Sequence, residues 1–249
     1  RLFISRIYHT LSMFATEHFF LSRLLGDAPA PYLAAYGGDY FAFALIGLSL
    51  QFYSGTGLDS FVRSVREAQM TGTLEAMLLT PTRLSTIILS SCLWDYSLTT
   101  VRAGVALAVG TLLVGLRLER GNVSAAVLIL LLTIVAFSSI GIIASAFIIV
   151  FKRGKPVAWF FNTVATLVGG VFYPVEIMPQ PLQWVSNVVP LTHAVRAMRR
   201  ALLLDMPMRD LLPDIGILTL FCLLLVPLSL FIFRRAVNRA RRDGSLTHY

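Results

Sequence analysis

The residues best placed to do chemistry in this chain are two charges inside one long apolar stretch, Asp95 and Arg102. They stand seven residues apart, so in a helix they share one face, two turns apart. A charge buried in lipid costs several kcal/mol unless it is paired or hydrated, so we expect both side chains to have a role. Three interpretations remain open: a structural ion pair within this stretch or with a neighbour such as Glu17, contact with a polar substrate headgroup, or a position at the membrane edge.

Other reactive side chains form no recognisable catalytic or metal-binding set. Cys92 and Cys222 both fall in apolar runs, where a free thiol packs as a small hydrophobic group. The four histidines are scattered without the spacing of metal ligands, and Asp95 has no neighbouring histidine. We therefore expect no metal and no catalytic residue, which disfavours a membrane-embedded enzyme.

Composition indicates an integral membrane protein. Of the 249 residues, 56% are hydrophobic and 14% are charged, against about 25% charged in an ordinary soluble domain. About 20 apolar residues cross the hydrocarbon core as a helix. We predict an all-α fold with one transmembrane domain over residues 1–249 and six spans at residues 2–25, 40–58, 84–116, 121–151, 156–175 and 215–233.

The basic residues set the predicted orientation. Most of them lie in the connections and chain ends on one side of the predicted spans, the side that carries both termini. The positive-inside rule assigns that side to the cytoplasm. Anionic lipid headgroups and topology then explain the net charge of +8, so we expect no nucleic acid as a partner. Under this orientation Arg196, Arg199 and Arg200 form an unusual basic trio on the outer side.

A polar, amphipathic segment, residues 62–81, connects the second and third predicted spans. Gly72 divides the segment, Thr71 or Thr73 can cap its second half, and Glu75 suits a first helical turn. Such a polar, turn-broken sequence is unfavourable within the hydrocarbon core of the membrane. The segment is expected at the membrane surface, either on lipid headgroups or docked on a cytoplasmic partner.

The long outer connection after the fifth predicted span is not a plain loop. Residues 177–195 carry no charge, yet Pro179, Pro181 and Pro190 prevent them from spanning as one helix. We predict a re-entrant helical hairpin over residues 176–200 that dips into the outer leaflet. The residues at its mouth, which we interpret as interfacial anchors or as an outer gate, are Tyr173, Pro174, Glu176 and Trp184.

Two of these segments resemble the motifs of ABC-2 type transporter permeases. Residues 67–81 read EAQMTGTLEAMLLTP and resemble the conserved cytoplasmic motif of that family. Residues 172–196 contain FYPVEIMP, LQWV and VPLTHAVR, and they resemble its second motif, which lies between the fifth and sixth spans. The resemblance covers nearly the whole chain and is weakest over the first span.

The resemblance implies the permease subunit of an ATP-driven exporter in a bacterial inner membrane, with an ABC-2, type V exporter-like fold. It implies a second permease copy, as a homodimer, and two separate ABC ATP-binding subunits that hold ATP and Mg²⁺. This chain has no Gly-x-x-x-x-Gly-Lys-Ser/Thr loop, so it is expected to bind no cofactor and to be no enzyme by itself. Carried over by position, the family's coupling helix assigns the ATPase contact to Arg66, Glu67, Thr71, Gly72, Thr73, Leu74, Glu75 and Pro81.

The expected substrate is amphipathic, because the family exports drugs, lipids, lipid-linked glycans and other amphiphiles. The alternative function is a proton-coupled secondary transporter in which Asp95 or Glu17 carries the proton. Such a transporter would lose its transport with the proton gradient and would ignore ATP. Inverted repeats, which are frequent in secondary transporters, are not evident in this sequence.

Overall fold

The structure is a computed structural model that describes residues 36, 40–73, 84–114, 121–151 and 155–242. These residues form helices, short 3-10 turns and connecting segments, and no strand occurs within the ranges described. The predicted all-α class is therefore confirmed for them. In chain order the elements are α2 (Tyr40–Met70), α4 (Leu84–Val114), α5 (Val123–Phe151), α6 (Lys155–Val168), η2 (Val175–Ile177), α7 (Gln180–Val188), α8 (Pro190–Leu203) and α9 (Met208–Arg242).

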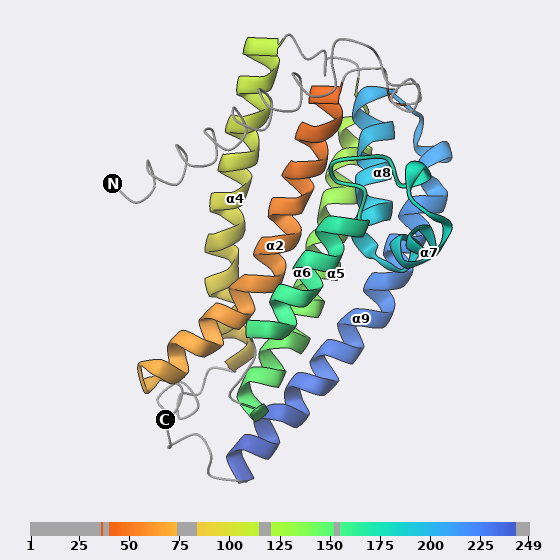
Figure 1. Cartoon of the computed structure of the whole chain (residues 1–249). Helices are drawn as coiled ribbons and strands as arrows, with labels where there is room; N and C mark the ends of the chain where they lie inside the picture. Colours follow the sequence, from red (N-terminus) through yellow and green to blue (C-terminus); the bar gives the residue numbers. More distant parts are fainter. Residues whose placement is uncertain (1–35, 37–39, 74–83, 115–120, 152–154, 243–249) are drawn as a thin grey trace.

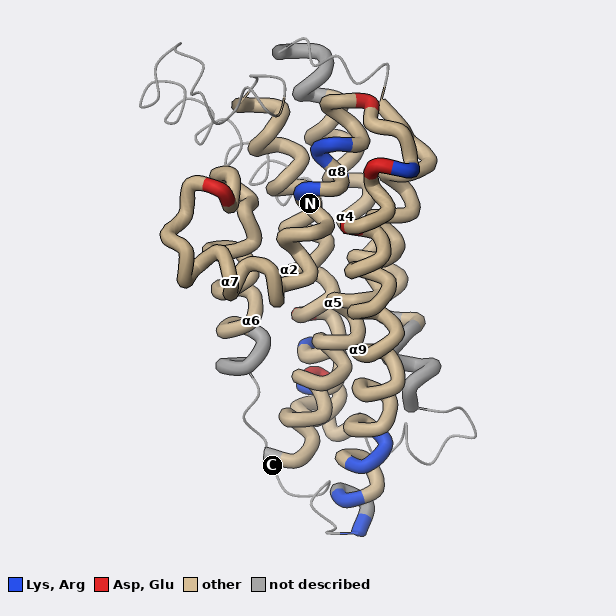
Figure 2. Tube along the Cα trace, turned by 90° about the vertical axis from the view of Figure 1, so that its right-hand side faces the viewer, with Lys and Arg blue, Asp and Glu red and all other residues tan. Residues whose placement is uncertain are grey.

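Among the described helices, α2, α5 and α9 are long and apolar enough to cross a membrane. The 31 residues of α2 extend about 46 Å at 1.5 Å per residue, more than the roughly 30 Å of the hydrocarbon core. Figure 1 shows that α2, α5, α9 and α4 form one bundle. Within it, α5 contacts both α2 and α9, and α4 contacts α2. In Figure 2 most Lys, Arg, Asp and Glu residues lie toward the ends of this bundle, and a small group of both signs lies partway along it.

Two apolar cores hold the helices together. The first joins α2, α5, α8 and α9 through residues that are at most 2% exposed, among them Leu50, Leu58, Phe137, Leu191 and Leu218. The second lies toward the C-terminal ends of α2 and α9 and includes Phe61, Val65, Ala144, Ile148 and Phe233.

A close backbone approach joins α2 to α5 between the two cores. A Cβ added to Gly141 would lie 2.1 Å from the carbonyl oxygen of Gly57. Only glycine fits this contact, because a side chain there would push the two helices apart.

The helix that contains the second predicted span is longer than that span. We expected it to end at residue 58 and a separate surface segment to begin at residue 62, but α2 continues without a break to Met70. Its buried face persists through Val65 and Ala68, which are 0% and 5% exposed. The helix can therefore bear exposed charges on one side while it still packs on the other. It ends where Gly72 adopts a positive φ of 67°, as glycine does just beyond a helix end.

The helix at the fifth predicted span is shorter than that span. We expected it to reach residue 175, whereas α6 ends at Val168. Gly169 and Gly170 follow, and Gly170 has a φ of 71°, a left-handed conformation that ends the helix. The 14 residues of α6 extend only about 21 Å, less than the hydrocarbon thickness.

The remaining helices coincide with the predicted span ranges to different degrees. α4 and α5 lie within the predicted ranges 84–116 and 121–151. The helix that contains the last predicted span extends beyond 215–233 at both ends, because α9 runs from Met208 to Arg242. The predicted first span, residues 2–25, lies outside the described residues. The count of six spans stays a prediction.

The segment predicted as a hairpin consists of two helices, α7 and α8, that meet at Val189. Pro190 begins α8 at a position where proline is well tolerated, because the first turn of a helix has no internal partner for its N–H. Most of α8 is buried against α2, α5 and α9, whereas most of α7 is exposed. The depth of this pair in a membrane stays a prediction.

Candidate functional site

A polar pocket of about 410 Å³ opens between α2, α4 and α6. Asp95 and Arg102, the two charges singled out by the sequence, both line it from α4. Two more charged side chains, Asp59 and Arg63, line it from α2. Further polar groups in its wall are Gln51, Thr56, Thr99, Asn162 and Thr166. The pocket therefore offers both signs of charge and neutral hydrogen-bonding groups within an otherwise apolar bundle.

Asp95 forms an ion pair with Arg63. The distance from Nη2 of Arg63 to Oδ2 of Asp95 is 2.6 Å, and the two side chains are 45% and 23% exposed. The partner of Asp95 is thus a neighbour on α2 that the sequence did not reveal, and Glu17 lies outside the described residues. Helix spacing showed that Asp95 and Arg102 share a face, but it could not show which neighbouring helix approaches that face.

Hydrogen bonds tie the three walls of the pocket together. Gln51 on α2 donates through Nε2 to Asn162 Oδ1, 3.0 Å away, and to the Thr166 hydroxyl on α6. The hydroxyl groups of Thr56 on α2 and Thr99 on α4 lie 2.8 Å apart. Between membrane helices such bonds are worth about 1 kcal/mol each, so α2 is held to both of its neighbours. Gln51 and Asn162 were not predicted as pocket residues; the signal that the sequence offers for them is an amide side chain within an apolar run.

Most polar residues at the C-terminal end of α2 and just after it are exposed on the surface of the chain. The Thr71 hydroxyl donates to the carbonyl oxygen of Glu67, 2.7 Å away, and lies 2.8 Å from the Thr73 hydroxyl. Arg66, Glu67, Thr71, Gly72 and Thr73 are all exposed. The other predicted coupling residues, Leu74, Glu75 and Pro81, lie outside the described residues.

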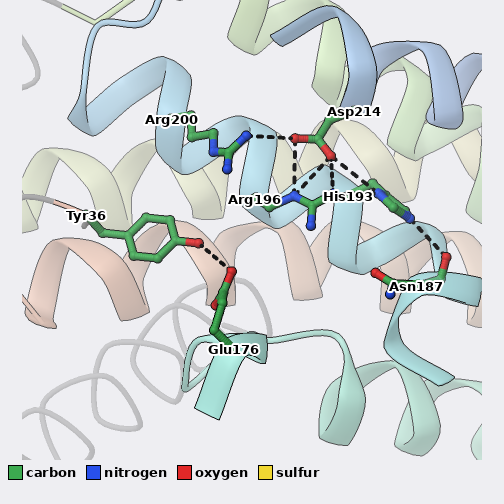
Figure 3. Close-up of polar contacts among 7 residues, drawn as sticks. All are labelled: Tyr36, Glu176, Asn187, His193, Arg196, Arg200 and Asp214. Carbon is green, nitrogen blue, oxygen red and sulfur yellow. Dashed lines mark hydrogen bonds and ion pairs between the residues drawn. The ribbon is translucent and has the colours of Figure 1, made fainter. Parts of the chain in front are cut away.

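The four predicted gate residues have different surroundings. The Tyr173 hydroxyl donates to the carbonyl oxygen of Leu167, 2.6 Å away, at the end of α6. Glu176 accepts a 3.4 Å hydrogen bond from the Tyr36 hydroxyl (Figure 3). Pro174 is buried and precedes η2, whereas Trp184 on α7 is 76% exposed.

A buried carboxylate, Asp214 of α9, gathers three side chains from α8 (Figure 3). Both of its oxygens accept hydrogen bonds from Arg196 Nε, at 3.0 and 3.2 Å, and Arg196 Nη2 also donates to it. Arg200 Nη1 lies 3.6 Å from its Oδ2. The hydrogen bond with Asp214 raises the pKa of Arg196 above its usual value, although burial acts in the opposite direction.

His193 completes this group. Its Nε2 lies 3.0 Å from the carbonyl oxygen of Asn187, which can only accept, so Nε2 carries the proton and donates. Its Nδ1 lies 3.3 Å from Asp214 Oδ1 and 3.1 Å from Arg196 Nη2. The imidazole thus links the start of α8 to the first turns of α9.

Arg199 joins three elements through backbone carbonyl groups. It is 2% exposed and donates to Phe43 on α2 at 3.0 Å and to Gly170 and Val171 after α6 at 2.7 and 2.6 Å. Its guanidinium carbon lies 3.3 Å from the centre of the Phe43 ring, a cation–π contact. Burial lowers the pKa of Arg199 to about 9, so the side chain remains a cation at neutral pH. The trio that looked misplaced in the sequence therefore fastens α8 to the rest of the fold.

Comparison with known protein families places these features in context. The family model described as ABC-2 type transporter matches residues 2–203, most of the chain. The chain belongs to the ABC-2 type transporter family. A search of curated proteins finds no matching relative. The match includes α2, α4, α5, α6, α7 and α8, and hence every residue that lines the polar pocket.

Membership of the ABC-2 family defines the general role of the chain. It is a multi-pass membrane permease, a type of subunit that is generally not catalytic and that associates with ABC ATP-binding subunits. Among the described residues, no group of three His, Cys, Asp or Glu side chains could hold a metal ion. The candidate site of this ABC-2 permease is the polar pocket between α2, α4 and α6.

Proposed function

We propose that this ABC-2 permease exports an amphipathic substrate, such as a drug, a lipid or a lipid-linked glycan, through movements driven by ATP on partner subunits. Two ABC ATP-binding subunits bind ATP and Mg²⁺, and this chain binds no cofactor. A second copy of the chain completes the path as a homodimer. The complex lies in a bacterial inner membrane with both ends of the chain in the cytoplasm.

The observation that carries this proposal is the continuity of α2. One unbroken helix bears the exposed residues Arg66 and Glu67 near its end, and the pocket residues Arg63 and Asp59 lie about one and two turns before them. A displacement of the exposed end therefore reaches the wall of the pocket through rigid backbone. Closure of the ATP-binding subunits against this end would move α2 relative to α4.

The pocket is the proposed binding place of the substrate headgroup. A cationic group would compete with Arg63 for the Asp95 carboxylate, and an anionic group would meet Arg102. The apolar part of the substrate would remain against the surrounding helices. A movement of α2 that separates Arg63 from Asp95 would change the charge presented to the headgroup and allow its release.

The outer gate is proposed at the opposite end of α2. Tyr36, which precedes α2, bonds to Glu176, and the Tyr40 hydroxyl donates to the carbonyl oxygen of Phe172, 3.1 Å away. Phe172 also lines the polar pocket. A movement of α2 would therefore displace the segment that contains Tyr173, Pro174 and Glu176. Trp184, on α7, is the remaining residue of the proposed gate.

The test is transport in proteoliposomes that contain the chain and its ATP-binding subunits. A fluorescent amphiphile should be moved on addition of ATP and Mg²⁺, and a proton ionophore should leave the initial rate unchanged. Transport that persists without ATP and stops with the ionophore would instead establish the proton-coupled alternative with Asp95 or Glu17. The ABC-2 family membership favours the first result.

A further inference from the structure

A second, larger pocket lies between the C-terminal parts of α5 and α9 and shares no lining residue with the polar pocket. Its volume is about 740 Å³, within the usual range for sites that hold small molecules. Its lining includes large apolar and basic residues: Phe147, Val150, Phe231, Arg235, Arg239 and Arg242. It lies at the end of the bundle where Figure 2 shows basic residues on α9.

The pocket is divided into an apolar part and a cationic part. Phe147 on α5 and Phe231 on α9 are 41% and 55% exposed, so their rings form an open apolar surface. Arg235, Arg239 and Arg242 follow at spacings of four and three residues, so they project from one face of α9. No Asp or Glu occurs among the described residues that line the pocket.

Arg235 connects the two parts. Its guanidinium carbon lies 4.9 Å from the centre of the Phe231 ring, within the range of a cation–π contact. The charge is therefore held over the edge of the apolar surface instead of extending away from it. A ligand that reaches this charge also covers the aromatic ring.

The position of the pocket along α9 determines its depth in the membrane. From Ile215 to Phe233 the helix carries no charged residue, and the arginines begin immediately afterwards. The apolar part of the pocket therefore lies at hydrocarbon depth and the cationic part at headgroup depth. An occupant must present an anion and an apolar chain at this boundary at the same time.

We propose that this pocket binds one anionic phospholipid. The phosphate lies among Arg235, Arg239 and Arg242, and the upper part of an acyl chain lies on Phe147 and Phe231. Basic clusters next to a membrane span attract anionic lipid in this way. An acidic protein segment, such as one from an ATP-binding subunit, would satisfy the arginines but leave the lipid-facing aromatic rings uncovered. This site is separate from the polar pocket and does not depend on the exported substrate.

The test measures lipid retained by the purified full-length chain in mild detergent by native mass spectrometry. The probes are phosphatidylglycerol and phosphatidylcholine with the same acyl chains. The Arg235→Gln/Arg239→Gln variant removes two charges from the pocket. The Arg209→Gln/Arg234→Gln variant is the matched control, because it removes two exposed arginines of α9 that do not line it.

We expect the unaltered chain to retain phosphatidylglycerol in preference to phosphatidylcholine. Two arginines near a membrane surface should account for about a 30-fold loss of this preference in the pocket variant, with little change in the control. An equal loss in both variants would reveal a general charge effect and overturn the proposal, as would retention of both lipids alike. The proposal would also fail if the pocket variant kept its lipid but lost its ATP-binding subunits.

Competition with soluble glycerol phosphate tests whether the pocket binds a whole lipid or only its phosphate headgroup. It carries the same phosphate without acyl chains, so it should fail to displace phosphatidylglycerol at matched concentration. Displacement by glycerol phosphate would show that the arginines bind a free phosphate and would contradict the lipid site.

Discussion

Arg63 on α2 and Asp95 on α4 form an ion pair across the polar pocket, with 2.6 Å between Nη2 and Oδ2. Arg63 stands four residues before Glu67, so the pair lies one helical turn from the exposed end of α2. The pair therefore links the proposed ATPase-facing end of the molecule to the proposed substrate pocket.

Asp95→Asn should reduce transport far more than stability. The pair is partly exposed, so its loss should cost at most about 1 kcal/mol of unfolding free energy. Loss of a charged contact with the substrate should lower transport about tenfold. Ser97→Ala, at an exposed position of the same helix, is the control. If Asp95→Asn lowers the melting temperature and leaves the transport rate intact, the pair is only structural.

Arg199→Met should destabilise the fold strongly. It leaves the carbonyl oxygens of Phe43, Gly170 and Val171 without their donor in a buried place. We expect a loss of about 3 kcal/mol or more, measured by thermal unfolding in detergent. Arg200→Met, which removes a half-exposed side chain 3.6 Å from its partner, should cost much less. Equal losses would refute the anchoring role of Arg199.

Asp214→Asn should separate α8 from α9. Removal of this buried charge leaves Arg196 without its counter-ion, and breaking a buried pair costs about 3–5 kcal/mol. Asp210→Asn, an exposed carboxylate in the first turn of α9, should cost at most about 1 kcal/mol. The comparison of the two melting temperatures checks this, and similar values for both would contradict it.

Gly141→Ala should loosen the contact between α2 and α5. The new Cβ would lie 2.1 Å from the carbonyl oxygen of Gly57, so backbone must move at a cost of about 1–3 kcal/mol. Gly104→Ala on α4 meets no atom within 4 Å and should be neutral or slightly stabilising. A destabilising Gly104→Ala together with a neutral Gly141→Ala would reverse this expectation.

The sequence was sufficient for features that depend on local composition. The apolar runs placed α4 and α5 within their predicted ranges, and the two motifs identified the family that the family model confirms. Helix ends were less predictable. Charges suggested that the second span stops at residue 58, but the buried face through Val65 and Ala68 carries α2 onward.

Contacts between distant segments could not be derived from the sequence. Spacing along one helix shows which side chains share a face, as for Asp95 and Arg102, but not that Arg63 would approach it. Likewise, Asp214 and Arg196 are 18 residues apart on two helices, and only the packing of α8 on α9 brings them together. The basic trio near residue 200 was noticed as unusual, and its buried partners explain why it is tolerated there.

The central claim is that the end of α2 couples this permease to ATP-binding subunits. The most direct measurement is affinity purification from native membranes in mild detergent, with quantitative mass spectrometry of the ATP-binding subunit that accompanies the chain. Glu67→Lys and Glu75→Lys reverse charges in the proposed contact, and Asp210→Lys, at the first turn of α9, is the control. We expect one ATP-binding subunit per unaltered or Asp210→Lys chain, and strong loss of that subunit from the Glu67→Lys and Glu75→Lys chains. Equal recovery in all four preparations, or no ATP-binding subunit with the unaltered chain, would contradict it.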